Sequence, residues 1–392
     1  MDIFFNYLFI ILKIFGGDGY QVLLAVYFIL MYKYWHLFVK EKILLVTLIF
    51  LLYGTVLSLF CDNKDYAFSD MLRYIYGWCF PFFLGYTFRS KYDTHKLILA
   101  TFYIFATLIF IGFFSYMGYI PEKILGIRFC HDNILTVCTW YRVPFAVQTA
   151  FMFVVSLTMV LFLENINKFL KVILVLVSFV FVLGILLSGS RIYYGAITVI
   201  LFIITVFYCY KSMKLKNILS VLLCLLLLAI AVCYKNETIK KRIKNLSVIT
   251  KDVSIVYRIN MYKYAISVFK QYPLFGTGPR QAMLKNEYNK VITDIDKNGH
   301  LHSTYLDILA NFGLIGLIIF LILILYILKE LIYTYKTTNS VLALAVFFAW
   351  ICILIGDNFD VTIKSPFVSS LYFWFTGLVL KNNKNIFLYE KL

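Results

Sequence analysis

Charged residues are scarce in this chain. Asp, Glu, Lys and Arg together make up 15% of the 392 residues, whereas hydrophobic residues make up 62% and the mean hydropathy is +0.84. Soluble domains carry about 25% charged and about 45–50% apolar residues. This scarcity excludes an ordinary soluble protein and predicts a polytopic membrane protein.

Other signals are missing as well. The eight cysteines form no CxxC pair, which argues against a metal or thioredoxin-like site, although Cys130 and Cys138 share one connection and are able to pair if it lies outside the cytoplasm. The chain opens with an acid and holds Lys13 inside its first apolar run, so we expect a retained short helix and not a cleaved signal peptide. No repeat and no Pro-rich or Gly/Ser-rich linker divides the chain, which favours one membrane domain over 1–392.

Long apolar runs are what the chain has in abundance. At about 1.5 Å per residue, each run is long enough to cross a hydrocarbon layer of roughly 30 Å as a helix, and this length excludes a sheet or barrel. We predict an all-α, polytopic integral membrane protein with about twelve transmembrane helices. The expected spans are 3–15, 19–37, 43–60, 71–88, 97–119, 144–163, 169–187, 192–210, 217–233, 304–328, 341–356 and 365–380.

The short connections alternate in charge. One set, such as "RSKYDTHK" and "KSMKLK", is basic, and the other set, such as "CDNKDYAFSD" and "DNFDVTIK", is acidic or nearly neutral. Because short basic connections stay in the cytoplasm, both termini are expected there. Two long connections then face outward, one from Gly118 to Val143 and a larger one over 234–303, and function is to be sought in them.

The larger outer loop is basic. It holds thirteen Lys or Arg against five Asp or Glu, a net charge of +8, within a chain of net charge +17. Positive-inside retention does not explain basic residues on the outer side, so the loop is either a solvated face or a binder of anionic substrate or lipid phosphate. We expect contact with membrane phospholipids and no nucleic acid.

An amphipathic helix followed by a tight turn is expected within this loop. The stretch "YRINMYKYAISVFKQYPLFGTGPRQAML" has apolar residues at helical spacing and then a Gly- and Pro-rich break. Arg258 lies near the start of this helix and Arg280 just beyond the break. A guanidinium group matches phosphate oxygens in pairs, so both are candidate diphosphate ligands; a surface salt bridge or a helix cap is the alternative for Arg280.

A second arginine site follows the Ser-rich turn "SGSR". Arg191 stands where two apolar spans nearly touch, and an arginine there is costly unless it is paired or at the interface. Snorkelling to outer head groups and an inward-facing anion site are both open. Arg73 and Arg142 occupy similar outer-end positions with weaker claims.

The stretch "HLHSTYLDILANFGLIGL" places two histidines and a carboxylate directly before an apolar span. Taken with "SGSR" and the loop containing "PLFGTGPR", this order of motifs resembles the O-antigen ligase and O-antigen polymerase superfamily of bacterial envelope glycosyltransferases. The resemblance covers roughly Ser188 to Leu317, while the first half of the chain matches only in hydropathy.

The resemblance implies an activity and a set of site residues. Members move a glycan from an undecaprenyl diphosphate carrier to an acceptor hydroxyl at the outer face of the bacterial inner membrane, without a metal ion or another cofactor. The family's key histidine matches His302, its loop arginine Arg280 and its arginine after the Ser-rich turn Arg191, while His300 matches a less constant place and Arg258 supports the site. Imidazole suits a general base and guanidinium groups suit a departing diphosphate.

Alternatives remain at this point. On the residue alone, His302 is equally a helix-capping or interfacial histidine; Ser303 replaces the family's usual Asn, and Asp307 either orients His302 or caps the helix. A ligase, with lipid A core oligosaccharide as acceptor, is favoured over a polymerase by the motif "HLHS" and the short connection "GDNFDVTIKSP". A lipid-linked sugar transporter is less favoured, because the inverted repeats typical of that class are not found.

Overall fold

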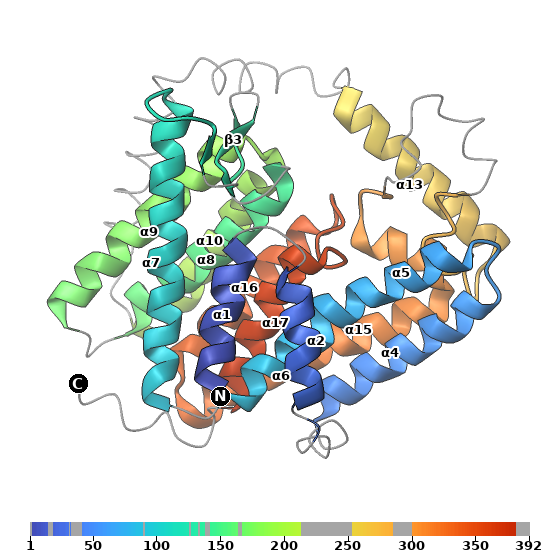
Figure 1. The fold of residues 1–392 in the computed structure, drawn as a ribbon, viewed down its shortest axis with the longest axis horizontal. Coiled ribbons are helices and arrows are strands. Elements are labelled where there is room, and N and C mark those ends of the chain that lie inside the picture. Colours follow the sequence, from blue (N-terminus) through green and yellow to red (C-terminus); the bar gives the residue numbers. More distant parts are fainter. Residues whose placement is uncertain are drawn as a thin grey trace.

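Helices make up almost the whole structure (Figure 1). The computed structural model describes residues 2–14, 19–30, 32, 41–88, 91–124, 127–131, 134–137, 142–163, 167–212, 253–284 and 300–381. Its helices are α1 (Asp2–Ile14), α2 (Gly19–Leu30), α4 (Lys42–Leu59), α5 (Lys64–Tyr74), α6 (Phe80–Thr87), α7 (Lys91–Tyr116), α8 (Arg142–Phe162), α9 (Lys168–Ser188), α10 (Arg191–Ser212), α13 (Val253–Gln271), α15 (Thr304–Thr338), α16 (Val341–Gly356) and α17 (Pro366–Lys381). A π-helical turn, η2 (Ile75–Cys79), joins α5 to α6.

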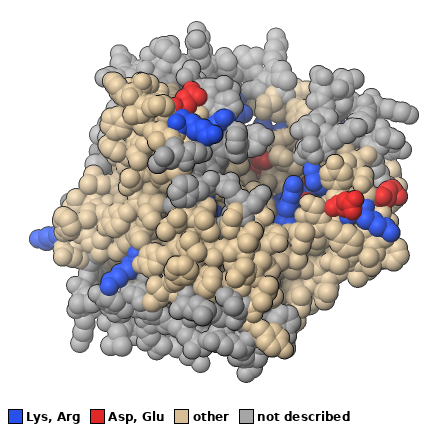
Figure 2. Space-filling view, viewed as in Figure 1, with Lys and Arg blue, Asp and Glu red and all other residues tan. Residues whose placement is uncertain are grey.

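The all-α membrane architecture is confirmed. Six described helices are long and apolar enough to cross a membrane, namely α4, α7, α8, α9, α10 and α15, and α1, α16 and α17 contain shorter apolar segments. Figure 2 agrees, because uncharged residues cover most of the described surface on the face it shows. The expected span 217–233 lies outside the described residues.

Some expected boundaries and connections differ from the structure. The span expected from residue 71 begins earlier, at Lys64. Ala67, Asp70, Met71 and Tyr74 recur at helical spacing and are buried, whereas the polar residues between them had suggested a connection. Helix α15 continues to Thr338 through the basic stretch that was expected to be a connection. The connection after α7, which was expected to face outward, forms two antiparallel pairs, β1 (Lys123–Ile124) with β2 (Ile127–Arg128) and β3 (Cys130–His131) with β4 (Ile134–Leu135).

The helices form one packed body around α8 and the last two helices. Helix α8 packs between α9 and α16, and α6 packs on α17. Gly85 and Gly377 allow the second contact, because a Cβ at Gly85 would lie 2.3 Å from the Trp374 carbonyl oxygen and one at Gly377 2.1 Å from that of Phe82. Small residues commonly let membrane helices approach in this way.

Trp78 connects the first half of the chain to the last. Its ring stacks on Phe373 with centroids 5.5 Å apart, and its indole nitrogen donates a hydrogen bond of 2.8 Å to the Ile363 carbonyl. Ile363 belongs to the segment between α16 and α17, residues 357–365, which we call the final loop. The fully buried indole of Trp78 therefore anchors the final loop.

Candidate active site at the start of α15

The histidine segment enters α15 through a capped start. The Ser303 hydroxyl accepts a hydrogen bond from the Leu306 amide at 3.4 Å, and Ser303 itself is extended, which is N-cap geometry. Ser303 thus performs the capping expected of an Asn at this position. His302, directly before the cap, has φ of 53°, a left-handed conformation that residues other than glycine rarely adopt.

Helix α15 is broken nine residues after its start, and the break holds the Gly- and Pro-rich turn. Gly313 has φ of 68° and interrupts the helix. The amides of Thr277 and Gly278 donate to the carbonyls of Ala310 and Asn311 at 3.0 and 2.8 Å. In return, the amides of Leu314 and Ile315 donate to the carbonyls of Pro273 and Leu274 at 2.9 and 3.3 Å.

This exchange resolves a general problem of membrane helices. A break leaves backbone amides and carbonyls without hydrogen-bond partners. At membrane depth each such group costs roughly several kcal/mol. The turn over 273–278 supplies those partners here. It also fixes the end of α13 against the segment that carries His302.

The final loop closes over the start of α15. The Thr304 amide donates to the carbonyls of Asp357 and Asp360 at 2.9 and 3.2 Å. From α13, Tyr262 donates to the Asn358 carbonyl at 2.9 Å and Arg258 to the Phe359 carbonyl at 3.2 Å. Three segments distant in sequence therefore meet at His302.

His300 is held by a carboxylate of the final loop. Its Nε2 lies 2.8 Å from Oδ1 of Asp360, and Oδ1 also accepts the Val361 amide at 2.8 Å. The His300 and His302 rings lie 4.5 Å apart between centroids, and the Tyr257 ring stands edge-on to His302 at 5.4 Å. One histidine thus has an acidic partner and its neighbour does not.

The two histidines have opposite pKa shifts. Burial alone would lower the pKa of His300, but the hydrogen bond and the charge of Asp360 outweigh it and raise the pKa. Burial, together with the charge of His300, lowers the pKa of His302 to about 4. Nδ1 of His302 is buried and has no hydrogen-bond partner within the described part of the chain. At neutral pH His302 is therefore uncharged, as a proton acceptor has to be.

A buried ion cluster lies beside the histidines. Nζ of Lys364, in the final loop, is 2.9 Å from Oδ2 of Asp70 and 3.2 Å from Oδ2 of Asp307. Burial would lower the pKa of Lys364, but the two carboxylates outweigh it and raise the pKa. Asp307 accordingly contacts Lys364, where the sequence had left open an orienting contact with His302 or a helix cap.

The structure places Arg258 beside the histidines and Arg280 against α5. Arg258 is held by Ser254 and Phe359 and lies near enough for its charge to lower the pKa of His302. Arg280 is largely buried, has φ of 61°, and lies with its guanidinium carbon 4.8 Å from the centroid of the Tyr66 ring.

The other predicted arginines lie on surrounding elements. Arg73 forms an ion pair of 3.8 Å with Asp70 and so joins the Lys364 cluster from within α5, not from the end of a span. Arg191 begins α10, two residues before Tyr193, whose ring packs on Gly356 next to the final loop. Arg142 begins α8 and is exposed.

The two histidines lie in a segment that matches the model of a known family. Residues 176–321 match the family model of O-antigen ligase, and we call them the O-antigen ligase segment. No curated protein matches the chain closely enough to count as a relative. The resemblance drawn from the motifs is confirmed for this segment, and the match supports an O-antigen ligase- or polymerase-type function.

The O-antigen ligase segment holds only part of the centre. His300, His302, Arg191, Arg258 and Arg280 all lie inside it. Asp70, Asp360 and Lys364 lie outside it, and sequence reasoning missed them. The available signal was the three charged residues in "DNFDVTIK", a connection of only a few residues that was expected to face outward.

The O-antigen ligase segment also contributes two of three possible metal ligands. His300, His302 and Asp360 each offer one ligand atom, and these atoms lie within 4.8 Å of one another. The direct hydrogen bond of 2.8 Å between His300 and Asp360 already satisfies one nitrogen and one oxygen of that set. Both a metal and a purely protonic site are compatible with these side chains.

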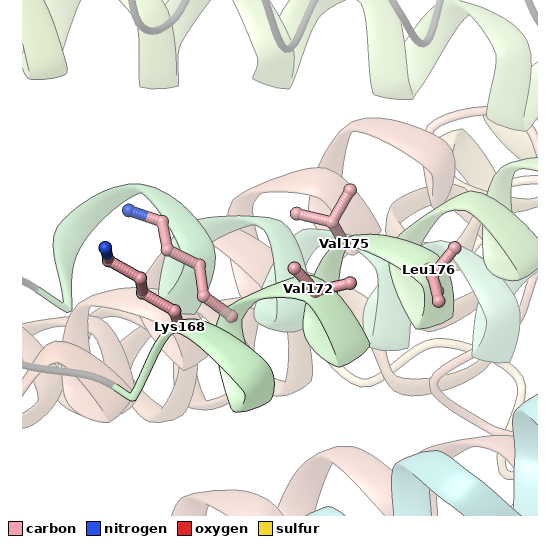
Figure 3. Close-up of a pocket in the computed structure, with 5 residues that line it drawn as sticks. Lys168, Val172, Val175 and Leu176 are labelled. Carbon is pink, nitrogen blue, oxygen red and sulfur yellow. The ribbon is translucent and has the colours of Figure 1, made fainter.

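A surface depression on α9 does not belong to this centre. It is lined by Lys168, Lys171, Val172, Val175 and Leu176 (Figure 3). All five residues come from the first turns of one helix, and the lining is apolar apart from two lysines at the helix end. Such a strip suits contact with lipid, with the lysines reaching toward head groups.

Cys130 is buried in β3, and its thiol lies 3.6 Å from the Gly112 carbonyl. Burial raises its pKa to about 11. The sequence left its pairing with Cys138 open, and Cys138 lies outside the described residues.

Proposed function

We propose that this protein transfers O-antigen glycan from an undecaprenyl diphosphate carrier to lipid A core oligosaccharide. The observation that carries the proposal is the histidine pair at the start of α15, inside the O-antigen ligase segment and beside Arg258. One imidazole is uncharged, and the other is paired with a carboxylate. A site that separates two like groups in this way has the character of acid–base machinery.

His302 is the proposed general base. As the acceptor hydroxyl attacks the anomeric carbon, its proton passes to the imidazole, which is uncharged before the substrate arrives. Binding of an anionic diphosphate nearby raises the pKa of His302 toward the working pH, because a negative charge favours the protonated form. The bond to the carrier diphosphate breaks, and the proton leaves finally with that group or with water.

Arginines are the proposed diphosphate ligands. Charge grows on the departing diphosphate, so fixed guanidinium groups lower the barrier more than they strengthen ground-state binding. Arg280 and Arg191 are assigned this role, with Arg258, Arg73 and His300 as further contacts and Arg142 at the margin. We assign the reaction no metal ion and no other cofactor.

The proposed setting is the inner membrane of a bacterium. The alternation of basic and neutral connections puts both termini in the cytoplasm and the start of α15 on the periplasmic side. The loop over 234–303 then contributes Arg258 and Arg280 from outside. Together 1–392 form a single membrane domain in this proposal.

A deletion strain tests the proposal. If the protein is a ligase, long glycan on the lipid A core disappears while carrier-linked polymer accumulates, and the wild-type gene restores the core-linked glycan. The His302→Ala variant inserts into the membrane but does not restore it. Single repeat units on the core would indicate the alternative, a polymerase with the same site and another acceptor; an unchanged lipopolysaccharide would contradict both.

A further inference from the structure

Helix α13 has two different faces. One face packs on the start of α15 and on the segment after the turn, through Met261, Tyr264, Ala265 and Val268 against Ala282, Met283, Leu301 and Ala310. The other face consists of Val256, Ile259, Lys263, Ile266 and Lys270, all exposed. These positions advance by three, four, three and four residues, so they form one straight stripe along the helix.

The apolar surface continues into the turn that follows α13. Leu274 and Phe275 are each 54% exposed, and Tyr272 is exposed as well. Their backbone is fixed, because the carbonyls of Pro273 and Leu274 accept hydrogen bonds from the amides after the break in α15. Two large apolar side chains are thus held outward by a rigid turn.

The turn lies next to the lipid-facing side of α15. Ile315, which donates to the Leu274 carbonyl, follows directly on the exposed Leu314. From Leu314 onward the outward positions of α15 are exposed and apolar: Leu314, Ile318, Leu321, Ile322 and Leu325. Since α15 is one of the helices long and apolar enough to span a membrane, this stripe meets acyl chains, and Leu274 extends it.

The turn also reaches below the outer end of α4. Tyr53 donates a hydrogen bond of 2.8 Å to the Phe312 carbonyl, directly beside Gly313. Tyr53 precedes Leu59, where α4 ends, by six residues, which corresponds to about 9 Å along a helix. The break in α15, and the turn docked in it, therefore lie within the depth range of the membrane helices.

We propose that the turn after α13 inserts Leu274 and Phe275 among the acyl chains of the outer leaflet, while Lys263 and Lys270 bind the phosphate groups of anionic phospholipids. Branched apolar and lysine side chains on one stripe match this layered surface, and the basic charge of the stripe complements anionic lipid. The insertion fixes the height of Arg258, on α13, and of Arg280, just after the turn. It is independent of which glycosyl transfer the protein performs.

The depth of Phe275 tests the first half of the proposal. The full-length chain with Phe275→Trp is reconstituted in phosphatidylcholine vesicles whose acyl chains carry bromine, which quenches a nearby indole. We expect the fluorescence added by this tryptophan to be quenched as strongly as that of Leu325→Trp, a lipid-facing position that is 65% exposed. Quenching no greater than that of Phe359→Trp, an exposed residue of the final loop, would overturn insertion and favour a protein partner.

The lysines are tested in the same vesicles. Replacing part of the phosphatidylcholine by phosphatidylglycerol is expected to increase the quenching at Phe275→Trp by about twofold, because anionic lipid draws the stripe inward. The double substitution Lys263→Gln and Lys270→Gln, which removes both charges and keeps polar side chains shorter by one heavy atom, should remove this increase. An equal increase with and without the lysines would overturn the phosphate half of the proposal. Leu325→Trp in each background verifies that the chain is folded and inserted.

Discussion

His300 and His302 stand two positions apart, yet their surroundings give them different charges. Asp360 favours the protonated form of His300, and a protonated His300 then disfavours protonation of His302. Asp360 therefore acts on both rings, although burial remains the main cause of the low pKa of His302. This makes Asp360 the residue whose removal should be most visible in the pH dependence of the reaction.

The substitution Asp360→Asn is expected to narrow the pH range of activity. His300 loses its acidic partner, so its pKa falls and activity that needs its positive charge is lost at lower pH. His302 loses the raising effect of the Asp360 charge, but it also loses the larger lowering effect of a charged His300, so its pKa rises above about 4 and the acid limb moves upward. The measurement is kcat/KM against pH, where each limb should move by about one unit. Asp360→Glu, which keeps the charge, is the control, and a profile that keeps its limbs while losing height would leave Asp360 a structural role only.

Arg280→Lys should lose transfer activity by roughly a hundredfold. The substitution keeps the charge but removes the planar fork that grips two phosphate oxygens. It does not add backbone strain, since arginine and lysine bear the same penalty at φ of 61°. Initial rates with carrier-linked glycan measure the effect, with Arg128→Lys in β2 as a matched exchange outside the site. A wild-type rate would show that charge alone suffices.

At the scale of elements, the sequence predicts the helices and the turn of the site better than the contacts between them. The turn "PLFGTGP", the helix before it and the span after His302 are all expected from composition and spacing, and all are found. The docking of the turn into α15 could not be expected, because the residues around Gly313 are apolar apart from Asn311 and the joining bonds link positions far apart in the chain. The same reason explains why Lys364 and Asp70 were missed, as nothing local pairs them.

Gly313→Ala should destabilise the protein. At φ of 68° a side chain is strained, and a Cβ at this position would lie 2.3 Å from the Leu274 carbonyl oxygen. Backbone strain of this kind costs about 1–3 kcal/mol, and displacement of the turn adds to it. The midpoint of thermal unfolding in detergent is expected to fall, and transfer activity with it.

The matched control is Gly195→Ala on α10, where an added Cβ meets no heavy atom within 4 Å. Alanine favours a helix over glycine by about 1 kcal/mol, so this variant should be as stable as the wild type or more so. Equal unfolding midpoints for Gly313→Ala and Gly195→Ala would show that the break is not needed for stability.

For the whole molecule, an all-helical membrane fold follows from hydropathy alone, because the cost of bringing backbone groups into lipid leaves few solutions. The orientation of the chain in the membrane rests on the charges of its short connections. Alkaline phosphatase fused after Tyr119, in the exposed turn following α7, should be active, since that enzyme folds only outside the cytoplasm. A phosphatase at the C-terminus should be inactive and a green fluorescent protein there bright; the reverse pattern would invert the proposed topology.

The interlocking of the turn with α15 also bears on how the protein is made and how it can be exchanged. During synthesis the turn leaves the ribosome before α15 does, so its carbonyls and amides acquire their final partners only when Ala310, Asn311, Leu314 and Ile315 arrive. The two segments mature as a pair. A chimaera that takes the turn from one relative and the helix from another has to preserve both sides of this joint, or it will fold incompletely in the membrane.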